Sequence, residues 1–169
     1  MQTPSIFALG RTPVPNFAGS SFEKAQLGGY HIFEGVEGAS TTPDVVIAAT
    51  GAEVVIAIDG AKKLAADGVR AVVASLPCLE VFEEQTLEYR EAVLPRGVPV
   101  VSVEASAIRG WERYAHAHVG LSTFGASAPA NDVLKYFGIT ADGVASKAKA
   151  ALGAYGKAAP ILPVNGPKL

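Results

Sequence analysis

The sequence has one cysteine, Cys78, so an internal disulfide is excluded and no CxxC pair is present to hold zinc. It has no apolar run near the ~20 residues that cross a bilayer. Residues 1–4 show no secretory pattern. No block of like charge occurs, and a formal net charge of −2 argues against a basic, nucleic-acid-binding face. We therefore expect a soluble protein from a reducing compartment, with neither a membrane nor a nucleic-acid partner.

Small and branched apolar residues are abundant instead. Apolar residues make up 49% of the chain and aromatic residues only 8%, a mixture that suits buried parallel strands covered by helices of small residues. The length of 169 residues fits one domain with a sizeable core.

Strand and helix patterns alternate along the middle of the chain. Residues 44–50 enclose only apolar side chains, which is typical of a central strand. A helix over 53–67, ended by Gly68, and a strand over 69–75 complete a βαβ unit. Further strands are predicted over 30–34 and 99–104, and further helices over 86–94, 111–117, 130–137 and from Thr140 onward. This alternation predicts a three-layer α/β fold with a mainly parallel sheet.

The two ends of the chain depart from that pattern. Residues 4–9 are short and apolar and predict a buried strand, which we do not expect to join this sheet. The proline- and glycine-dotted segment that follows, to about Gly29, predicts an arm that needs another surface to lie on. After Pro160 the proline-punctuated tail is expected to be unstructured.

The turn at Thr50, Gly51 and Ala52 follows a strand and opens a helix, so its amides could hold an anion. Neither GxGxxG nor GxxxxGK[ST] is present, and Glu53 adds a negative charge where an anion would bind. A structural turn is the simpler interpretation, and an anion site is the alternative.

No catalytic set is evident among the other polar residues. His116 and His118 lie two positions apart, so on a helix they cannot share a metal and would converge only on a strand. We expect them to be hydrogen-bonded. Cys78 has no histidine assignable to it and is interpreted as a buried or interfacial thiol. Glu104, at a strand end, is expected to be a capping or solvent-facing residue, not a catalytic one.

Several short motifs occur in a characteristic order. They are Ala49-Thr-Gly-Ala-Glu-Val54, Ser75-Leu-Pro-Cys78, Val101-Ser-Val-Glu-Ala105, Thr123-Phe-Gly-Ala-Ser-Ala-Pro-Ala130 and Tyr136-Phe-Gly-Ile-Thr140. In this order they resemble the last part of transketolases, above all the fungal type and the related dihydroxyacetone synthases. The resemblance covers roughly residues 2–156.

The resemblance implies an α/β, three-layer α/β/α fold with a mainly parallel five-stranded sheet, like the transketolase C-terminal domain. We divide the chain into the end of a pyrimidine-binding domain with a linker arm (1–29), the C-terminal domain (30–157) and a flexible tail (158–169). The family transfers a two-carbon ketol unit between sugar phosphates, using thiamine diphosphate and Mg or Ca. The motifs that bind these cofactors belong to domains outside this sequence. The chain alone is therefore expected to bind no cofactor or metal and to be inactive.

The resemblance also singles out Arg11 as a substrate-binding residue. Residues 8–12 align with a Leu-Ser-Arg-Gln-Asn segment of the family, whose arginine holds the substrate phosphate. A guanidinium can grip a phosphate with two parallel hydrogen bonds. Gly10, Thr12 and Pro13 replace the family's Ser, Gln and Asn, which leaves a different loop shape open.

Two functions stay open. In the first, the chain is a transketolase C-terminal domain or subunit, part of a homo- or hetero-oligomer with a chain that carries the diphosphate- and pyrimidine-binding domains. In the second, it is a free-standing, non-catalytic module that binds a small anion or regulator at the Gly51 turn. The ending Pro167-Lys168-Leu169 resembles a variant of the Ser-Lys-Leu peroxisomal address, so a peroxisomal location is the alternative to the cytosol.

Overall fold

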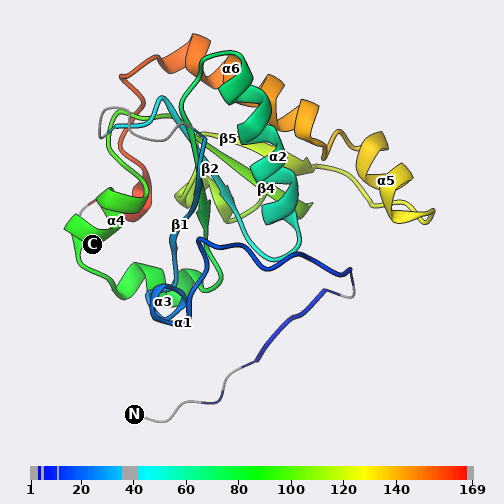
Figure 1. Ribbon diagram of the computed structural model, residues 1–169, viewed down its shortest axis with the longest axis horizontal. Coiled ribbons are helices and arrows are strands. Elements are labelled where there is room, and N and C mark those ends of the chain that lie inside the picture. Colours follow the sequence, from blue (N-terminus) through cyan, green and yellow to red (C-terminus); the bar gives the residue numbers. More distant parts are fainter. Residues whose placement is uncertain (1–3, 5, 11, 36–41, 167–169) are drawn as a thin grey trace.

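The computed structural model describes residues 4, 6–10, 12–35 and 42–166. Within them, a five-stranded sheet has the order β1-β3-β2-β4-β5. Neighbouring strands from β3 to β5 run parallel, and β1 pairs with β3 in the antiparallel direction. The strands are β1 (Tyr30–Glu34), β2 (Val45–Ala49), β3 (Ala71–Ser75), β4 (Val100–Ala107) and β5 (Ala117–Leu121). The mainly parallel five-stranded sheet is therefore confirmed (Figure 1).

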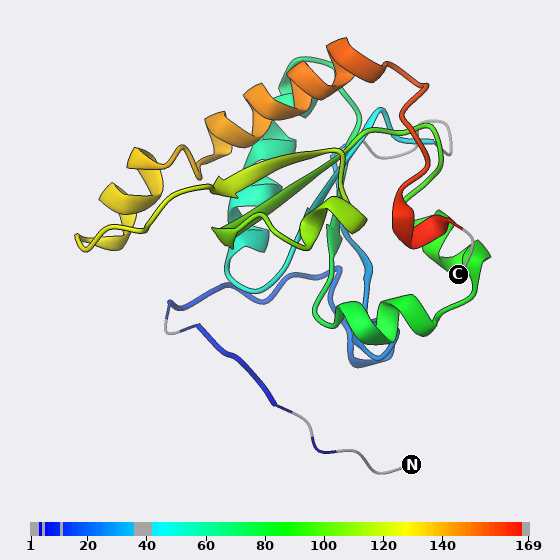
Figure 2. The ribbon, with the colours of Figure 1, turned by 180° about the vertical axis from the view of Figure 1, so that it is seen from behind.

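Helices cover both faces of the sheet, as Figures 1 and 2 show. One face carries α2 (Glu53–Ala66) and α6 (Ala141–Tyr155). The other carries α3 (Leu79–Glu84), α4 (Leu87–Val93) and the short 3₁₀ helices η1 (Trp111–Arg113) and η2 (Pro163–Asn165). Two further helices, α1 (Phe22–Ala25) and α5 (Ala130–Tyr136), contain no buried residue. The predicted three-layer arrangement is confirmed, and no described helix is long and apolar enough to span a membrane.

The βαβ unit forms as predicted. Every residue of β2 is completely buried, because the strand lies in the middle of the sheet between the two helical layers. Gly68 follows α2 with a φ of +78°, a conformation that favours glycine at a helix end. Thr140 caps α6, its Oγ1 accepting a hydrogen bond from the amide of Gly143.

The segment 111–117 differs from its predicted helix. Only η1 is helical there. The amide of His116, just before β5, donates to the carbonyl of Val100, and the chain then enters β5. Trp111 and Tyr114 lie three residues apart, a spacing that suits a helix. A single 3₁₀ turn is enough, however, to bury both side chains in the core on the α3 and α4 side of the sheet. The fifth strand of the sheet is β5, which begins where the predicted helix was expected to end.

The arm splits into two parts. The described residues of 4–10 form no strand, and Ile6, Phe7 and Leu9 are exposed, so the predicted buried strand is wrong here. The expectation that this segment stays out of the sheet is confirmed. From Phe17 onward the arm lies on its own domain. Phe17 packs against the core on the α2 and α6 side of the sheet, and the hydroxyl groups of Ser20 and Tyr30 are 3.0 Å apart.

The tail is also packed. Leu162 and Val164 are buried in the core on the α3 and α4 side of the sheet, and Asn165 donates from Nδ2 to the carbonyl of Leu94 at 2.8 Å. The prediction that the tail is unstructured is therefore wrong as far as residue 166. The apolar residues between its prolines pack into the core on the α3 and α4 side of the sheet. Pro167-Lys168-Leu169 lies outside the described residues.

Candidate functional site

The carboxyl ends of the parallel strands form the edge at which α/β folds bind ligands. β2 is the switch point, since the chain passes from β2 to β3 on one side and later returns to β4 on the other. The turn after β2 and the end of β4 therefore meet at this edge, and they carry the predicted anion site and Glu104.

The residues Thr50, Gly51 and Ala52 do form the turn between β2 and α2. Gly51 has a φ of +58°, which non-glycine residues adopt only with strain. A cavity of about 340 Å³ separates this turn from the arm. It is lined by Val14, Pro15, Asn16, Phe17, Ser20, Gly51 and Val54. No lysine or arginine of the described chain lines this cavity, so an anion there would depend on backbone amides.

Two carboxyl groups share the same edge. Glu53 is the first residue of α2, and Glu104 lies in β4. Burial raises the pKa of Glu104 to about 7, and the negative charge of Glu53 acts in the same direction. Glu104 can therefore hold a proton near neutral pH. Glu53 lies where an anion at the Gly51 turn would be repelled.

The two histidines are hydrogen-bonded, as predicted. His116 accepts at Nδ1 from the amide of Val100 at 2.9 Å, and its Nε2 lies 2.8 Å from the carbonyl oxygen of Pro160. His118 Nδ1 lies 2.7 Å from the hydroxyl of Ser102. Burial lowers the pKa of His118. Across the described ranges, no group of three metal-ligating side chains gathers.

A second polar cluster joins α3 to η1 beside a cavity of about 580 Å³. Glu83 accepts from the hydroxyl of Tyr114 and pairs with Arg113 at 2.7 Å. Arg90 is buried and donates to the carbonyl oxygens of Glu83 and Gln85. Burial and the Glu83 charge raise the pKa of Tyr114. These bonds hold two loops together, which is a structural role.

The cluster was missed because Glu83 and Tyr114 are far apart in sequence. Only the strand order places their loops side by side. Cys78, at the start of α3, is partly exposed, and its Sγ lies 3.6 Å from Glu80 Oε2. Arg11 lies outside the described residues, and its neighbours Gly10 and Thr12 are exposed on the arm.

Comparison with known proteins identifies this arrangement. The family model described as transketolase-like TK C-terminal domain matches residues 28–140. Transketolase 1 of Saccharomyces cerevisiae is 45% identical over 153 residues, covering 90% of this chain and 22% of the relative.

Solved structures agree. Transketolase from Leishmania mexicana superposes with a TM-score of 0.79 at 45% identity, covering 85% of this chain and 21% of that one. A Pichia stipitis transketolase in complex with sedoheptulose-7-phosphate gives a TM-score of 0.82 at 40% identity, covering 91% and 22%. The chain thus spans about a fifth of the length of these relatives. It belongs to the transketolase family, and the part of transketolase that it represents is the C-terminal domain.

Proposed function

We propose that this chain is the C-terminal domain or subunit of a transketolase-type enzyme that transfers two-carbon ketol units between sugar phosphates. The observation that carries the proposal is the family match over residues 28–140, together with 45% identity to a curated transketolase. Thiamine diphosphate and a divalent metal would be bound by the remaining four-fifths of such an enzyme, in a homo- or hetero-oligomer.

The described residues of this domain support an assembly role. Its candidate edge offers one protonatable carboxyl group, Glu104, beside the charge of Glu53, and no cluster of metal ligands within the described chain. Its Glu83–Tyr114 pair is bonded within the domain, although Nε of the neighbouring Arg90 is buried without a partner among the described residues. Such a domain stabilises the catalytic part by packing against it.

Arg11 is the residue through which the chain would touch substrate. Its alignment with the family's phosphate-binding arginine supports this role, and its guanidinium suits a sugar phosphate because it can form two parallel charge-assisted hydrogen bonds. The complex of the Pichia stipitis relative with sedoheptulose-7-phosphate shows that a relative binds a sugar phosphate.

The test is a ketol-transfer assay with a xylulose phosphate donor, thiamine diphosphate and magnesium. This chain is measured alone, then with a transketolase chain truncated to its two cofactor-binding domains. We expect activity in the mixture only. Arg11→Ala should raise the KM for the phosphorylated donor about 10- to 100-fold, whereas transfer from hydroxypyruvate, which carries no phosphate, should change little.

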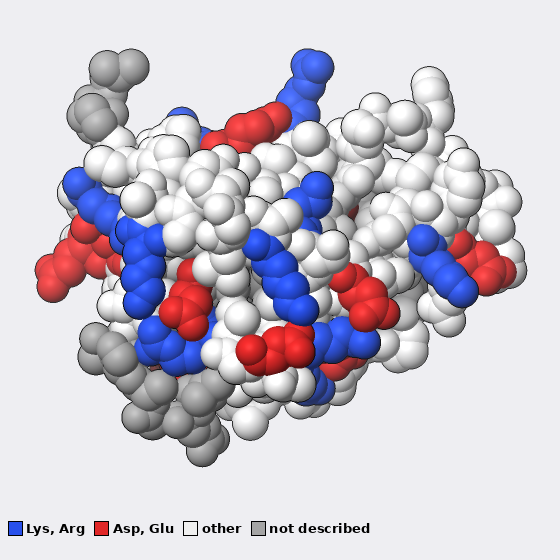
Figure 3. All heavy atoms as spheres, turned by 90° about the horizontal axis from the view of Figure 1, so that it is seen from above, with Lys and Arg blue, Asp and Glu red and all other residues white. Residues whose placement is uncertain are grey.

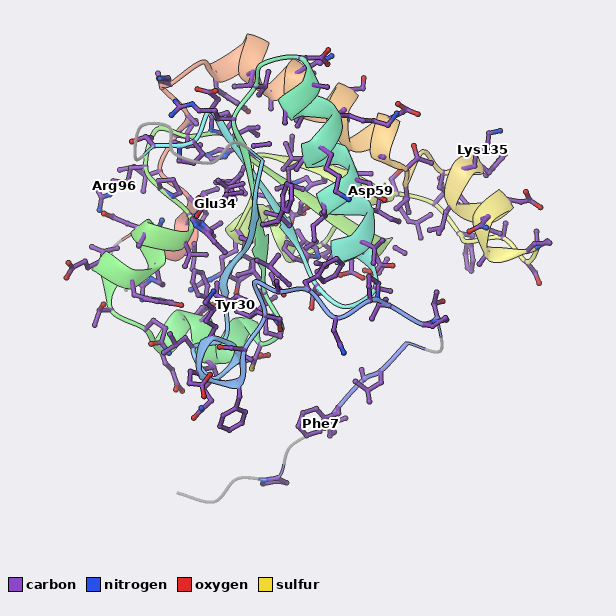
Figure 4. All side chains as sticks on the ribbon, in the orientation of Figure 1. Phe7, Tyr30, Glu34, Asp59, Arg96 and Lys135 are labelled. Atoms are coloured by element: carbon purple, nitrogen blue, oxygen red, sulfur yellow. The ribbon has the colours of Figure 1, made fainter. Side chains whose placement is uncertain are left out.

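Arg96→Ala is the matched control, because Arg96 pairs with Glu91 and lies away from the arm (Figure 4). Activity of the chain alone would overturn the proposal. An unchanged KM in Arg11→Ala would remove the substrate-contact role and leave the assembly role intact.

A second candidate function is a module that binds a small anion at Thr50, Gly51 and Ala52. The cavity of about 340 Å³ beside this turn favours it. Phosphate added to the isolated chain should then raise its Tm. Glu53→Gln should enlarge that rise by removing the opposing charge, and a Tm that is independent of phosphate in both proteins would exclude this function.

For location, we propose the cytosol, with the peroxisome as the alternative suggested by Pro167-Lys168-Leu169. The final dozen residues fused to a fluorescent protein would decide between them. A punctate signal that coincides with a peroxisomal marker would favour the peroxisome.

A further inference from the structure

The loop that follows β5, together with α5, stands out from the layered body in both views of the ribbon (Figures 1 and 2). No residue of α5 is buried. Phe124, in the loop, is 99% exposed, and Tyr136, at the end of the helix, is 80% exposed. Large apolar side chains in such positions are unfavourable in water unless another surface covers them.

The loop part of this surface carries no charge, whereas α5 contains Asp132 and Lys135. Residues 122–131 include no charged side chain. The face formed by α2 and α6 is different, since Lys63–Asp142 and Lys149–Asp67 ion pairs lie on it. Figure 3 shows charges of both signs spread over that face, and a basic and an acidic side chain also at the end where α5 lies. Exposed aromatic side chains with charged residues at their border are typical of a protein interface, which has an apolar core and a polar rim.

The protruding element contains a preformed hollow. A cavity of about 420 Å³ lies between the loop and the helix, lined in part by Phe124, Val133, Tyr136 and Phe137 and by one charged residue, Asp132. The rings of Tyr136 and Phe137 meet edge to face with their centroids 5.0 Å apart, which fixes one wall of the cavity. The hollow can accept an apolar side chain of a partner while Phe124 inserts into that partner.

The arm lies on the same side of the molecule. In both views the segment 12–14 is close to the side on which α5 projects. Val14 is half-exposed there, and Ile6, Phe7 and Leu9 are exposed further along the arm. Figure 4 shows Phe7 on a stretch of the arm that is set apart from the layered body.

We propose that Phe124, Val133, Tyr136 and Phe137, the α5 surface, form the docking surface for the cofactor-binding domains of a transketolase, with Phe124 and Tyr136 as its anchors. This inference rests on the proposed function. The relatives identify the occupant, because the matched region is only 22% of a transketolase and is its C-terminal domain. The remainder of a relative's chain therefore precedes this domain and reaches it through the arm.

The experiment measures binding and not activity alone. The full chain is titrated against a transketolase chain truncated to its two cofactor-binding domains, by calorimetry and by sedimentation velocity. The variant Phe124→Ser/Tyr136→Ser should raise Kd about 30-fold or more, because aromatic anchors carry much of the energy of an interface. Both residues are exposed, so the variant should keep the Tm of the wild type.

Ile161→Ser is the matched control, since Ile161 is 53% exposed but lies beside η2, at the opposite end from α5 (Figure 1). It should bind like the wild type. Hydrogen exchange should in addition show protection of residues 122–137 in the complex.

The outcomes separate the two proposals. If the wild type fails to bind the truncated transketolase, the proposed function fails. If the wild type binds and the double variant binds equally well, the function stands and the α5 surface is overturned. Concentration-dependent dimers of the isolated chain, abolished by the double variant, would show that a second copy occupies this surface and would also overturn the inference.

Discussion

The hydroxyl of Ser102 and Nδ1 of His118 lie 2.7 Å apart, and they join neighbouring strands at positions that are directly paired in the sheet. Burial lowers the pKa of His118, the charge of Lys147 lowers it further, and Glu112 opposes them. In an NMR titration the His118 ring should therefore titrate below the ordinary value of about 6.5. Lys147→Ala should move its pKa upward.

Lys149→Ala provides the control for that titration. Lys149 is two residues further along α6, but its amine is paired with Asp67 at 2.7 Å. Its removal should leave the His118 pKa unchanged. An equal shift in both variants would show that general charge, and not the local placement of Lys147, sets the pKa.

The stability of the domain should fall as the pH rises through the range in which Glu104 ionises. The pKa of Glu104 is about 7 in the folded chain, against an ordinary value of 4.5, so the folded state binds more protons than the unfolded state between these values. The contribution is fully present below pH 4.5 and is lost as the pH passes 7. Glu104→Gln should then be more stable than the wild type at about pH 8, by about 1–2 kcal/mol after discounting for solvent screening.

Urea unfolding at about pH 5 and about pH 8 measures this effect. Glu34→Gln is the control, because Glu34 is exposed at the end of β1, and it should leave the pH dependence unchanged. Glu53→Gln should reduce the dependence partly, since its charge is the second cause of the raised pKa. A flat stability profile of the wild type would contradict the prediction.

Gly28 and Gly68 should respond differently to replacement by alanine. Both have φ values near +77°, so each variant carries a backbone penalty of about 1 kcal/mol. A Cβ at Gly68 would meet no atom within 4 Å, whereas one at Gly28 would lie 2.3 Å from the amide nitrogen of Phe82 and 2.5 Å from the carbonyl of Cys78. Gly28→Ala should therefore lower the Tm by much more than Gly68→Ala. Similar losses of Tm in thermal melts would show that the close packing of Gly28 against the start of α3 is not what limits this position.

Removing the side chain of Asn165 should loosen the tail. Asn165→Ala leaves the buried carbonyl of Leu94 without its 2.8 Å hydrogen bond, at a loss of about 1–3 kcal/mol in the free energy of unfolding. Asn131→Ala, at an exposed position of α5, should lose far less. Chemical denaturation compares the two, and a truncation before residue 159 should destabilise the chain at least as much as Asn165→Ala.

The parts of the fold that the sequence predicts well are those that repeat a simple pattern. The run 45–49 contains only apolar residues, and α2 follows it with polar residues on one side only, so both were predictable. β5 was not, because buried Trp111 and Tyr114 three residues apart imitate a helix. The packing of Leu162 and Val164 was hidden by the prolines around them, since burial there depends on a groove made by distant residues.

In the candidate site, too, the sequence predicts the local features but not the contacts between distant segments. The sequence places Gly51 after a strand and Glu104 near the end of another. That they share an edge follows from β2 pairing with both β3 and β4, which no local pattern contains. The raised pKa of Glu104 comes first from its burial and second from the charge of Glu53, which follows the neighbouring strand β2.

The irregular pairing of β1 has a consequence for how this protein behaves at high concentration. The register between β1 and β3 shifts between His31 and Phe33, and His31 is held by a 2.9 Å contact between its Nε2 and the carbonyl oxygen of Val93. A bulge on an edge strand misaligns the free amides and carbonyl groups that another chain would need to extend the sheet. The arm adds to this protection, because Gly19 lies directly against the backbone of Ile32 in β1, so close that a side chain would not fit there. β1 is therefore protected against edge-to-edge aggregation by its bulge and by the arm of the same chain.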